Sequence, residues 1–169
     1  MALPKISTHN RGFSLIEILI VIGLFAMIAG VTLIVSMDSF RGHSFYSERN
    51  VLISTIQKAR SQAISNMCFG GGCVDGKPHG VHIESTQYTV FQGSSWAGRD
   101  SAIDEVVSIT SKSVTASGFV DVIFEQLTGE ATFSPSSSHD IVLTDSAGKD
   151  SSTITITQAG RICIDDPSC

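Results

Sequence analysis

Residues 13–37 read FSLIEILIVIGLFAMIAGVTLIVSM, and this apolar run decides how the rest of the chain is organised. Twenty residues without a charge extend from Ile18 to Met37, about the length of helix that crosses the hydrocarbon core of a membrane. The polar residues 1–12 that precede the run contain Lys5 and Arg11. Because positively charged flanks stay on the cytoplasmic side, the sequence predicts a single-pass protein whose C-terminal part is exported.

Two simpler interpretations of this run are a secretory signal peptide and a plain membrane anchor. A signal peptide has an apolar region of about 7–15 residues and a cleavage site of small residues. The run is longer, and Met27 makes the sequence Met27-Ile28-Ala29 a poor cleavage site. A plain anchor does not explain Glu17, because an ionisable group in an apolar run is costly unless it is paired.

The junction RGFSLIE, residues 11–17, closely resembles the leader junction of type IV prepilins and type II secretion pseudopilins. The resemblance implies cleavage between Gly12 and Phe13 by a membrane prepilin peptidase, followed by N-methylation of Phe13. It also implies that Glu17 is the carboxylate used in assembly. Residues 1–12 would then be a leader peptide, and the chain a structural subunit rather than an enzyme, with no cofactor.

A physical account of Glu17 agrees with this resemblance. Cleavage creates a positive amine on Phe13, and Glu17 of a neighbouring subunit offers a negative partner. In a low-dielectric setting such a pair is stronger than in water, and a charge left alone is costly. The pair would therefore specify the axial register between subunits. Pairing of Phe13 and Glu17 within one chain is the alternative, and it would give no assembly signal.

A helical pattern continues in residues 38–67. Apolar residues recur there at steps of four, three and four, which places them on one helix face. They are Leu52, Ile56, Ala59 and Ala63, and the flanking Val51, Ile64 and Met67 widen the stripe. The sequence predicts one helix from Phe13 to about Asn66, about 80 Å long. Its part in residues 13–37 suits a membrane, whereas residues 38–67 are amphipathic and should pack on a sheet. The glycine-rich segment Cys68–Cys73 is expected to end the helix.

Short β-type runs separated by turns fill residues 68–169. The runs are 81–83, 88–91, 106–109, 120–124, 131–133, 141–144, 153–157 and 161–164. Val120, Val122 and Phe124 are expected to share one face, as are Ile154 and Ile156. A long helix followed by short strands predicts an α+β fold with one small antiparallel sheet, which is the type IV pilin-like layout.

The order of these elements resembles the GspH/FimT group of minor pseudopilins and minor pilins. The matching stretches are residues 59–64 on the helix, residues 80–83 in the first strand, and residues 154–162 near the end. The resemblance implies a minor subunit of a type II secretion pseudopilus or a type IV pilus. The partners it implies are other pilins or pseudopilins, an inner-membrane assembly platform and membrane lipid.

The four cysteines form two close pairs in the sequence, Cys68 with Cys73 and Cys163 with Cys169. An even number in an exported chain favours disulfides over a zinc site. Two local loops are the simplest connectivity, and pairing across the sheet, such as Cys68 with Cys163, stays open.

Other candidate sites in the sequence are weak. Asp145 and Asp150 could offer oxygen ligands to Ca²⁺, but a solvated hairpin turn is the simpler interpretation. His79 and His82 are three residues apart, so in one strand they point to opposite faces and do not form a metal site together.

The charge balance argues against nucleic acid as a partner. The chain has 11 basic and 16 acidic residues, and loss of Lys5 and Arg11 with the leader leaves 9 basic residues, a net charge of −7. Binding to phosphates requires clustered positive charge, for which a local patch around Arg99 and Lys112 is the only suggestion. A DNA-uptake minor pilin and a membrane-tethered binding protein with a pilin-like anchor are the alternative functions.

Overall fold

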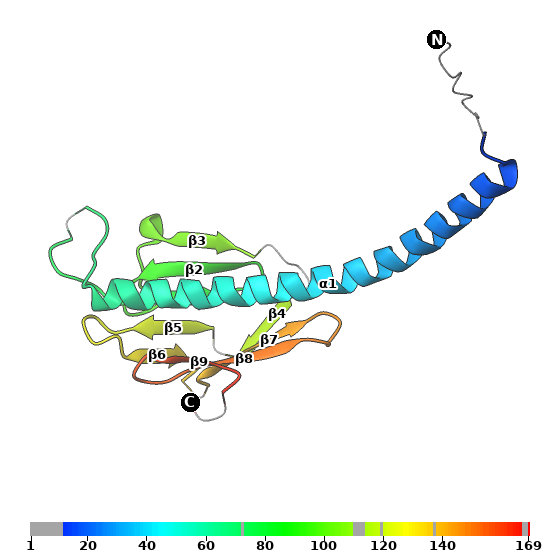
Figure 1. Ribbon diagram of the computed structural model, residues 1–169. Helices are drawn as coiled ribbons and strands as arrows, with labels where there is room; N and C mark the ends of the chain where they lie inside the picture. Colours follow the sequence, from blue (N-terminus) through cyan, green and yellow to red (C-terminus); the bar gives the residue numbers. More distant parts are fainter. Residues whose placement is uncertain (1–11, 72, 110–113, 119, 137, 167–168) are drawn as a thin grey trace, which may run out of the picture. The chain divides into compact units, whose positions relative to one another are not determined.

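The computed structural model describes residues 12–71, 73–109, 114–118, 120–136, 138–166 and 169, with the backbone alone at residues 32–41. The chain divides into two compact units, Met1–Phe40 and Arg41–Cys169. Helix α1 (Leu15–Ile64) contributes to both units, and every strand belongs to the second unit (Figure 1).

The described strands of the second unit confirm the predicted α+β class. They are β1 (His79–Ile83), β2 (Gln87–Gln92), β3 (Glu105–Ser108), β4 (Val114–Gly118), β5 (Asp121–Phe124), β6 (Ala131–Ser134), β7 (Asp140–Asp145), β8 (Ser151–Ile156) and β9 (Ile162–Ile164). A short 3₁₀ helix, η1 (Ser101–Ile103), lies between β2 and β3.

The prediction of a single sheet is wrong. The strands form one five-stranded sheet in the order β3-β2-β1-β5-β6 and one four-stranded sheet in the order β4-β7-β8-β9. Neighbouring strands are antiparallel in both sheets. Both sheets contribute to one hydrophobic core with the C-terminal part of α1, so the fold has a helix layer over two adjacent sheets (Figure 1).

The register of the strands follows the alternation of apolar residues. In β7 and β8 every second residue is buried, and Ile141 lies opposite Ile154 in the ladder. In the other sheet Val81 lies opposite Val122, and both are fully buried. In β7 and β8 a shift of one residue would turn the buried side chains to solvent, so burial fixes the pairing of these two strands.

The predicted helical stripe is confirmed at its centre and wrong at its C-terminal end. Leu52, Ile56, Ala59 and Ala63 are fully buried. Each buried Leu or Ile side chain contributes about 1.5–3 kcal/mol relative to exposure. Val51 is half-buried, and the stripe is extended by the buried Phe45 and Ile53. In contrast, Ile64, the last residue of α1, is 41% exposed, and Met67, which lies beyond the end of the helix, is 43% exposed.

Asn66 ends the helix, rather than the glycines of the segment Cys68–Cys73 as predicted. Asn66 has a positive φ of 56°, a conformation that asparagine tolerates better than most residues. The Met67 amide donates to the Gln62 carbonyl at 3.0 Å, and the Asn66 amide donates to the Ala63 carbonyl at 3.1 Å. These two bonds form a Schellman motif, which satisfies carbonyl groups at the end of α1.

Two further corrections concern the strands. Strand β4 is absent from the predicted set because Thr115, Ala116, Ser117 and Gly118 carry little β-type pattern, and its pairing with β7 forms it. Val120 does not share the buried face of Val122 and Phe124: it precedes β5 and is 42% exposed. The shared face of Ile154 and Ile156 is confirmed, since both are fully buried.

A buried polar pair joins the helix to the first sheet. Glu48 on α1 and Tyr88 on β2 are both buried, and the Tyr88 hydroxyl hydrogen-bonds to the Glu48 carboxylate. Burial, together with the nearby negative charge of Glu48, raises the pKa of Tyr88 far above its usual value. The phenol therefore stays neutral and serves as a donor that helps to position α1 on β2.

Candidate assembly site

The N-terminal site residues lie at the start of α1. Gly12, Phe13 and Ser14 precede the helix, which begins at Leu15. The Ser14 carbonyl accepts from the amide of Glu17 at 3.0 Å and from the amide of Ile18 at 3.2 Å. Glu17 thus lies in the first helical turn, where a negative side chain is favourable because the helix dipole is positive there.

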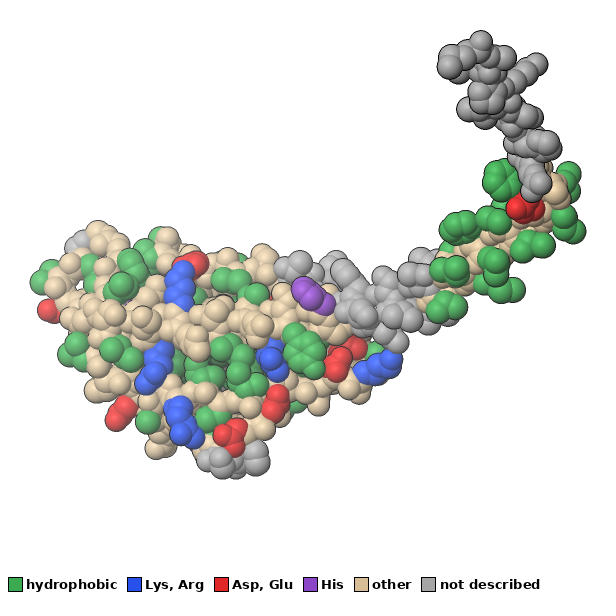
Figure 2. Space-filling model, in the orientation of Figure 1, with side chains coloured by type: hydrophobic (Ala, Val, Ile, Leu, Met, Phe, Trp, Pro, Cys, Tyr) green, Lys and Arg blue, Asp and Glu red, His purple; other side chains and the backbone are tan. Residues whose placement is uncertain are grey.

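The first unit presents an apolar surface on every side of the helix. All side chains of residues 12–31 are exposed, and Phe13 and Leu15 are 78% and 80% exposed. Figure 2 shows hydrophobic side chains over this segment and a mixture of polar, charged and hydrophobic side chains over the second unit. Exposed apolar surface of this extent indicates contact with a membrane or with other proteins.

Glu17 interrupts this surface with a carboxylate. Among the described residues, no Lys, Arg or His side chain lies within 4.0 Å of it. The described part of a single chain therefore supplies no cation for Glu17. The pairing with a Phe13 amine, within a chain or between chains, stays a prediction.

The cysteines pair locally in the structure. Cys68 is bonded to Cys73 and Cys163 to Cys169, with Cα atoms 5.8 Å and 6.0 Å apart. The first bond closes the loop that follows α1, and the second joins β9 to Cys169, whose sulfur lies 4.0 Å from the Thr155 carbonyl oxygen on β8. Both bonds connect residues within the second unit.

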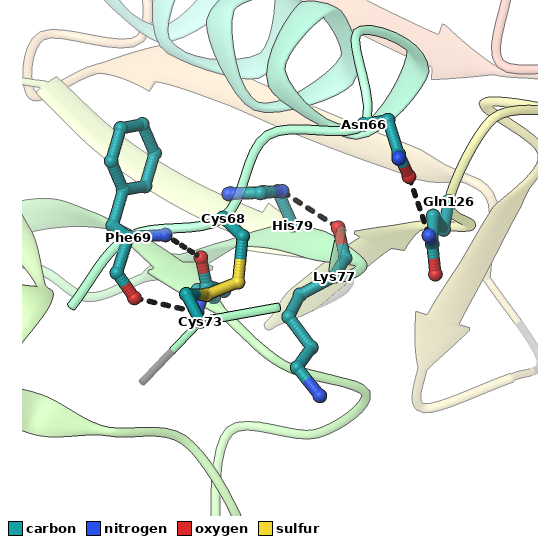
Figure 3. Close-up of a disulfide and its surroundings, with 8 residues drawn as sticks. Asn66, Cys68, Phe69, Cys73, Lys77, His79 and Gln126 are labelled. Carbon is teal, nitrogen blue, oxygen red and sulfur yellow. Dashed lines mark hydrogen bonds between the residues drawn. A yellow bond between two sulfur atoms is a disulfide. The ribbon is translucent and has the colours of Figure 1, made fainter. Parts of the chain in front are cut away.

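The Cys68–Cys73 loop is fastened to β2 by a reciprocal pair of hydrogen bonds (Figure 3). The Phe69 amide donates to Gln92 Oε1 at 2.7 Å, and Gln92 Nε2 donates to the Phe69 carbonyl at 3.3 Å. The Phe69 ring contacts the ring of His79 edge-on, with centroids 5.8 Å apart. At the base of the loop the Gln126 amide donates to the Asn66 side chain.

His79 lies beneath this loop and is 1% exposed. Burial lowers the pKa of His79, an effect that its hydrogen bond to the Lys77 carbonyl partly opposes. A neutral ring has one N–H donor, and only Nδ1–H can bond the Lys77 carbonyl, 3.0 Å away.

His82 and Arg99 lie on the ring of Trp96. His82 stacks on Trp96 with centroids 3.8 Å apart, and the Arg99 guanidinium lies 3.2 Å from the Trp96 centroid. Asp121 and Glu84 contact the two nitrogens of His82. Arg99 also forms an ion pair with Asp104 at 2.7 Å, so its charge is already balanced. Lys112, the other residue of the suggested basic patch, lies outside the described residues.

The calcium candidates belong to the hairpin between β7 and β8. The Asp145 amide donates to the Asp150 carbonyl at 2.9 Å, and the Asp145 carboxylate accepts from the Ala147 amide at 3.1 Å. Within the described ranges, no group of three His, Cys, Asp or Glu side chains is arranged to hold a metal ion.

The sequence also predicts a membrane span in residues 13–37. When the described residues of each helix are considered, none provides an apolar stretch long enough to span a membrane.

Comparison with known proteins identifies the N-terminal segment. A family model for the prokaryotic N-terminal methylation motif matches residues 7–33. This motif is the signal of type IV pilins and pseudopilins, and with the α+β fold it is consistent with a pilin-like architecture. It supports a type IV pilin-like or pseudopilin subunit, which implies processing by a prepilin peptidase and assembly with other pilins. No curated protein and no solved structure matches the chain.

Proposed function

We propose that the chain is a minor pseudopilin or minor pilin, a non-enzymatic filament subunit of a type II secretion pseudopilus or a type IV pilus. It is processed between Gly12 and Phe13, methylated on Phe13, and held before assembly as a single-pass protein of the bacterial inner membrane. Residues 13–37 form the membrane segment. The observation that carries the proposal is the methylation motif at residues 7–33, which overlaps the start of a helix whose described N-terminal side chains are exposed and, apart from Glu17, almost all apolar.

Glu17 gives this proposal its mechanism. The Phe13 amine exists only after cleavage, so unprocessed chains lack the positive partner. In the processed filament, the Glu17 carboxylate of one subunit pairs with the Phe13 amine of the next. At 4 Å and an effective dielectric constant of about 20, two unit charges attract by about 4 kcal/mol before desolvation is counted. Apolar packing alone favours many axial positions, whereas this pair favours one.

The second unit supports the structural role. It has its own hydrophobic core and two local disulfides. The resemblance of the sequence to the GspH/FimT group favours a minor subunit over a major one. Arg99 is neutralised by Asp104, and this supports a structural subunit rather than a DNA-uptake subunit.

Substitution of Glu17 tests the mechanism. In Glu17→Ala, the chain should insert and be cleaved as in wild type, but its amount in sheared filaments should fall at least tenfold. The cause is the unpaired Phe13 amine, which is costly in a low-dielectric filament core. Glu17→Gln keeps the size and hydrogen-bonding capacity of the side chain and should fail as well, because it lacks the charge.

Intact mass of the purified protein provides the control on processing. The expected mass lacks residues 1–12, carries one added methyl group and lacks the thiol hydrogens of both disulfides. Normal incorporation of Glu17→Ala would contradict the pairing mechanism. A mature chain that begins at any residue other than Phe13 would contradict the whole proposal.

A further inference from the structure

A groove with two arginines lies in the second unit, beside the last turns of α1. It has a volume of about 400 Å³ and lies between α1 and the turn that leads into β9. Arg60 comes from the helix side and Arg161 from the turn side. Gln57 and Ser61, one helical turn apart, line the wall that α1 provides, and Ser65 lines the groove just after the helix ends.

Arg60 is held in position by the turn. Its Nη2 donates to the Ala159 carbonyl at 3.2 Å, and its side chain lies against Gly160. A Cβ atom at Gly160 would lie 2.6 Å from Arg60 Nε, so this approach requires glycine. Within the described residues, the buried Nε of Arg60 has no hydrogen-bond partner. The guanidinium is thus held against the turn.

Arg161 is placed by hydrogen bonds of its own backbone. Its amide donates to Thr157 Oγ1 at 3.0 Å, and its carbonyl accepts from the Thr157 amide at 2.9 Å. The side chain is exposed at the edge of the groove. Both arginines therefore extend from backbone that the fold holds in place.

Their charges are not balanced by the described part of the chain. Arg49, Lys58 and Arg99 each lie within 4.0 Å of a carboxylate. For Arg60 and Arg161, the described residues offer no carboxylate within that distance. Two like charges that share one groove repel each other, and a bound anion relieves this repulsion.

The side chains that line the groove favour a carboxylate as the bound anion. Guanidinium groups bind carboxylates with paired hydrogen bonds, and the serine hydroxyls and the Gln57 amide can add further donors. Ile64 and Ile162 add apolar surface that suits the methylene groups of an acidic side chain. The chain itself is rich in such groups, with 16 acidic against 11 basic residues, so another copy offers complementary charge.

We propose that this groove binds a carboxylate side chain of a second copy of this chain. The inference rests on the proposed function, because precursors held in one membrane share that surface with other copies of the chain. It adds a contact between the globular units to the contact made by the N-terminal helices. Nucleic acid is the competing anionic partner, and the experiment must distinguish it from a second copy of the chain.

Cross-linking of the full chain in membranes tests the proposal. One co-expressed form carries Arg161→Lys, which keeps the charge and adds an amine that a carbodiimide can couple to a carboxylate. The other form carries an epitope tag after Cys169. After capture by the tag, peptides that join residue 161 of the first form to an acidic residue of the tagged form are expected. The control is Gln158→Lys, which places a lysine at an exposed position in the same turn that does not line the groove. The yield of peptides cross-linked through residue 161 should be at least fivefold higher than the yield through residue 158 in this control.

Charge reversal provides the second measurement. Arg161→Glu should weaken capture of the untagged chain by the tagged chain about tenfold, the effect of losing one charge-assisted hydrogen-bonded contact. Lys77→Glu makes the same change in net charge at another exposed position and should alter capture less than twofold.

Three outcomes would overturn the proposal. They are equal cross-linking from residues 161 and 158, coupling only within one chain, and salt-sensitive binding of duplex DNA that Arg161→Glu abolishes. Each outcome concerns the groove alone. Failure of the proposed function would instead appear in the intact mass and in the assembly of Glu17→Ala.

Discussion

The two ends of α1 have the same secondary structure and opposite surfaces. Between Phe45 and Ala63, apolar side chains form a stripe that the two sheets cover, and most polar side chains other than Glu48 and Thr55 face solvent. Between residues 12 and 31, all side chains are exposed although nearly all are apolar. The chain therefore supplies a partner for one end of its helix only, and a membrane or other subunits must supply the partner for the other end.

The largest expected effect comes from making the same isoleucine-to-alanine substitution at each end of α1. Ile56→Ala should lower the free energy of unfolding of the second unit by about 2–5 kcal/mol, because it leaves a cavity in the core. Ile20→Ala removes the same atoms from an exposed position, and should change that free energy by less than about 0.5 kcal/mol. Urea unfolding of the full chain in detergent, followed by Trp96 fluorescence, measures both. Similar losses in the two variants would mean that the N-terminal residues also stabilise the second unit.

Two glycines extend the comparison to the backbone. Gly160 has a φ of +74°, and a Cβ there would lie 2.2 Å from the Gly129 carbonyl oxygen. Gly160→Ala should therefore destabilise the second unit by about 1–3 kcal/mol. Gly23 lies in α1 with open space around it, so Gly23→Ala should leave the second unit unchanged and favour the helix by up to about 1 kcal/mol.

The filament assay gives Gly23→Ala a further use. If Gly23 allows helices of neighbouring subunits to approach closely, the alanine variant should assemble less well although its monomer is as stable as wild type. Unchanged assembly would mean that Gly23 does not lie at a close helix contact. Thermal melting of the monomer and yield of sheared filaments separate the two effects.

The smallest expected effect is a pH dependence confined to the second unit. Because the pKa of His79 is lowered in the folded state, the unfolded chain binds more protons at this residue as the pH falls. The stability contributed by neutral His79 is complete above about pH 6.5, its ordinary pKa, and is lost as the pH falls toward the folded value. His79→Gln should flatten this part of the stability profile below about pH 6.5, measured by urea unfolding. An identical slope in both proteins would exclude His79 as its source.

The sequence pattern predicted those parts of the fold that depend on local periodicity. Leu52, Ile56, Ala59 and Ala63 specify a buried helix face, and Ile154 with Ile156 specifies a buried strand face. Glu17 could be identified from the sequence because a single carboxylate in an apolar run is costly unless it is paired. In each case the residue type and the spacing together carry the information.

Other features arise from contacts between distant segments. The division into two sheets depends on which strands pair, and β4 forms because Val114–Gly118 pairs with β7. The end of α1 depends on Asn66, whose positive φ is not evident from its neighbours. The groove brings together Arg60 and Arg161, which are far apart in the sequence, so spacing gave no signal for it.

The short separation of the paired cysteines has a consequence for biogenesis. The partners are 5 and 6 residues apart, so each thiol meets its own partner more often than it meets the other pair. Oxidation of the unfolded chain can therefore reach the native connectivity before the sheets exist, without reshuffling of mispaired bonds. Neither bond ties one sheet to the other.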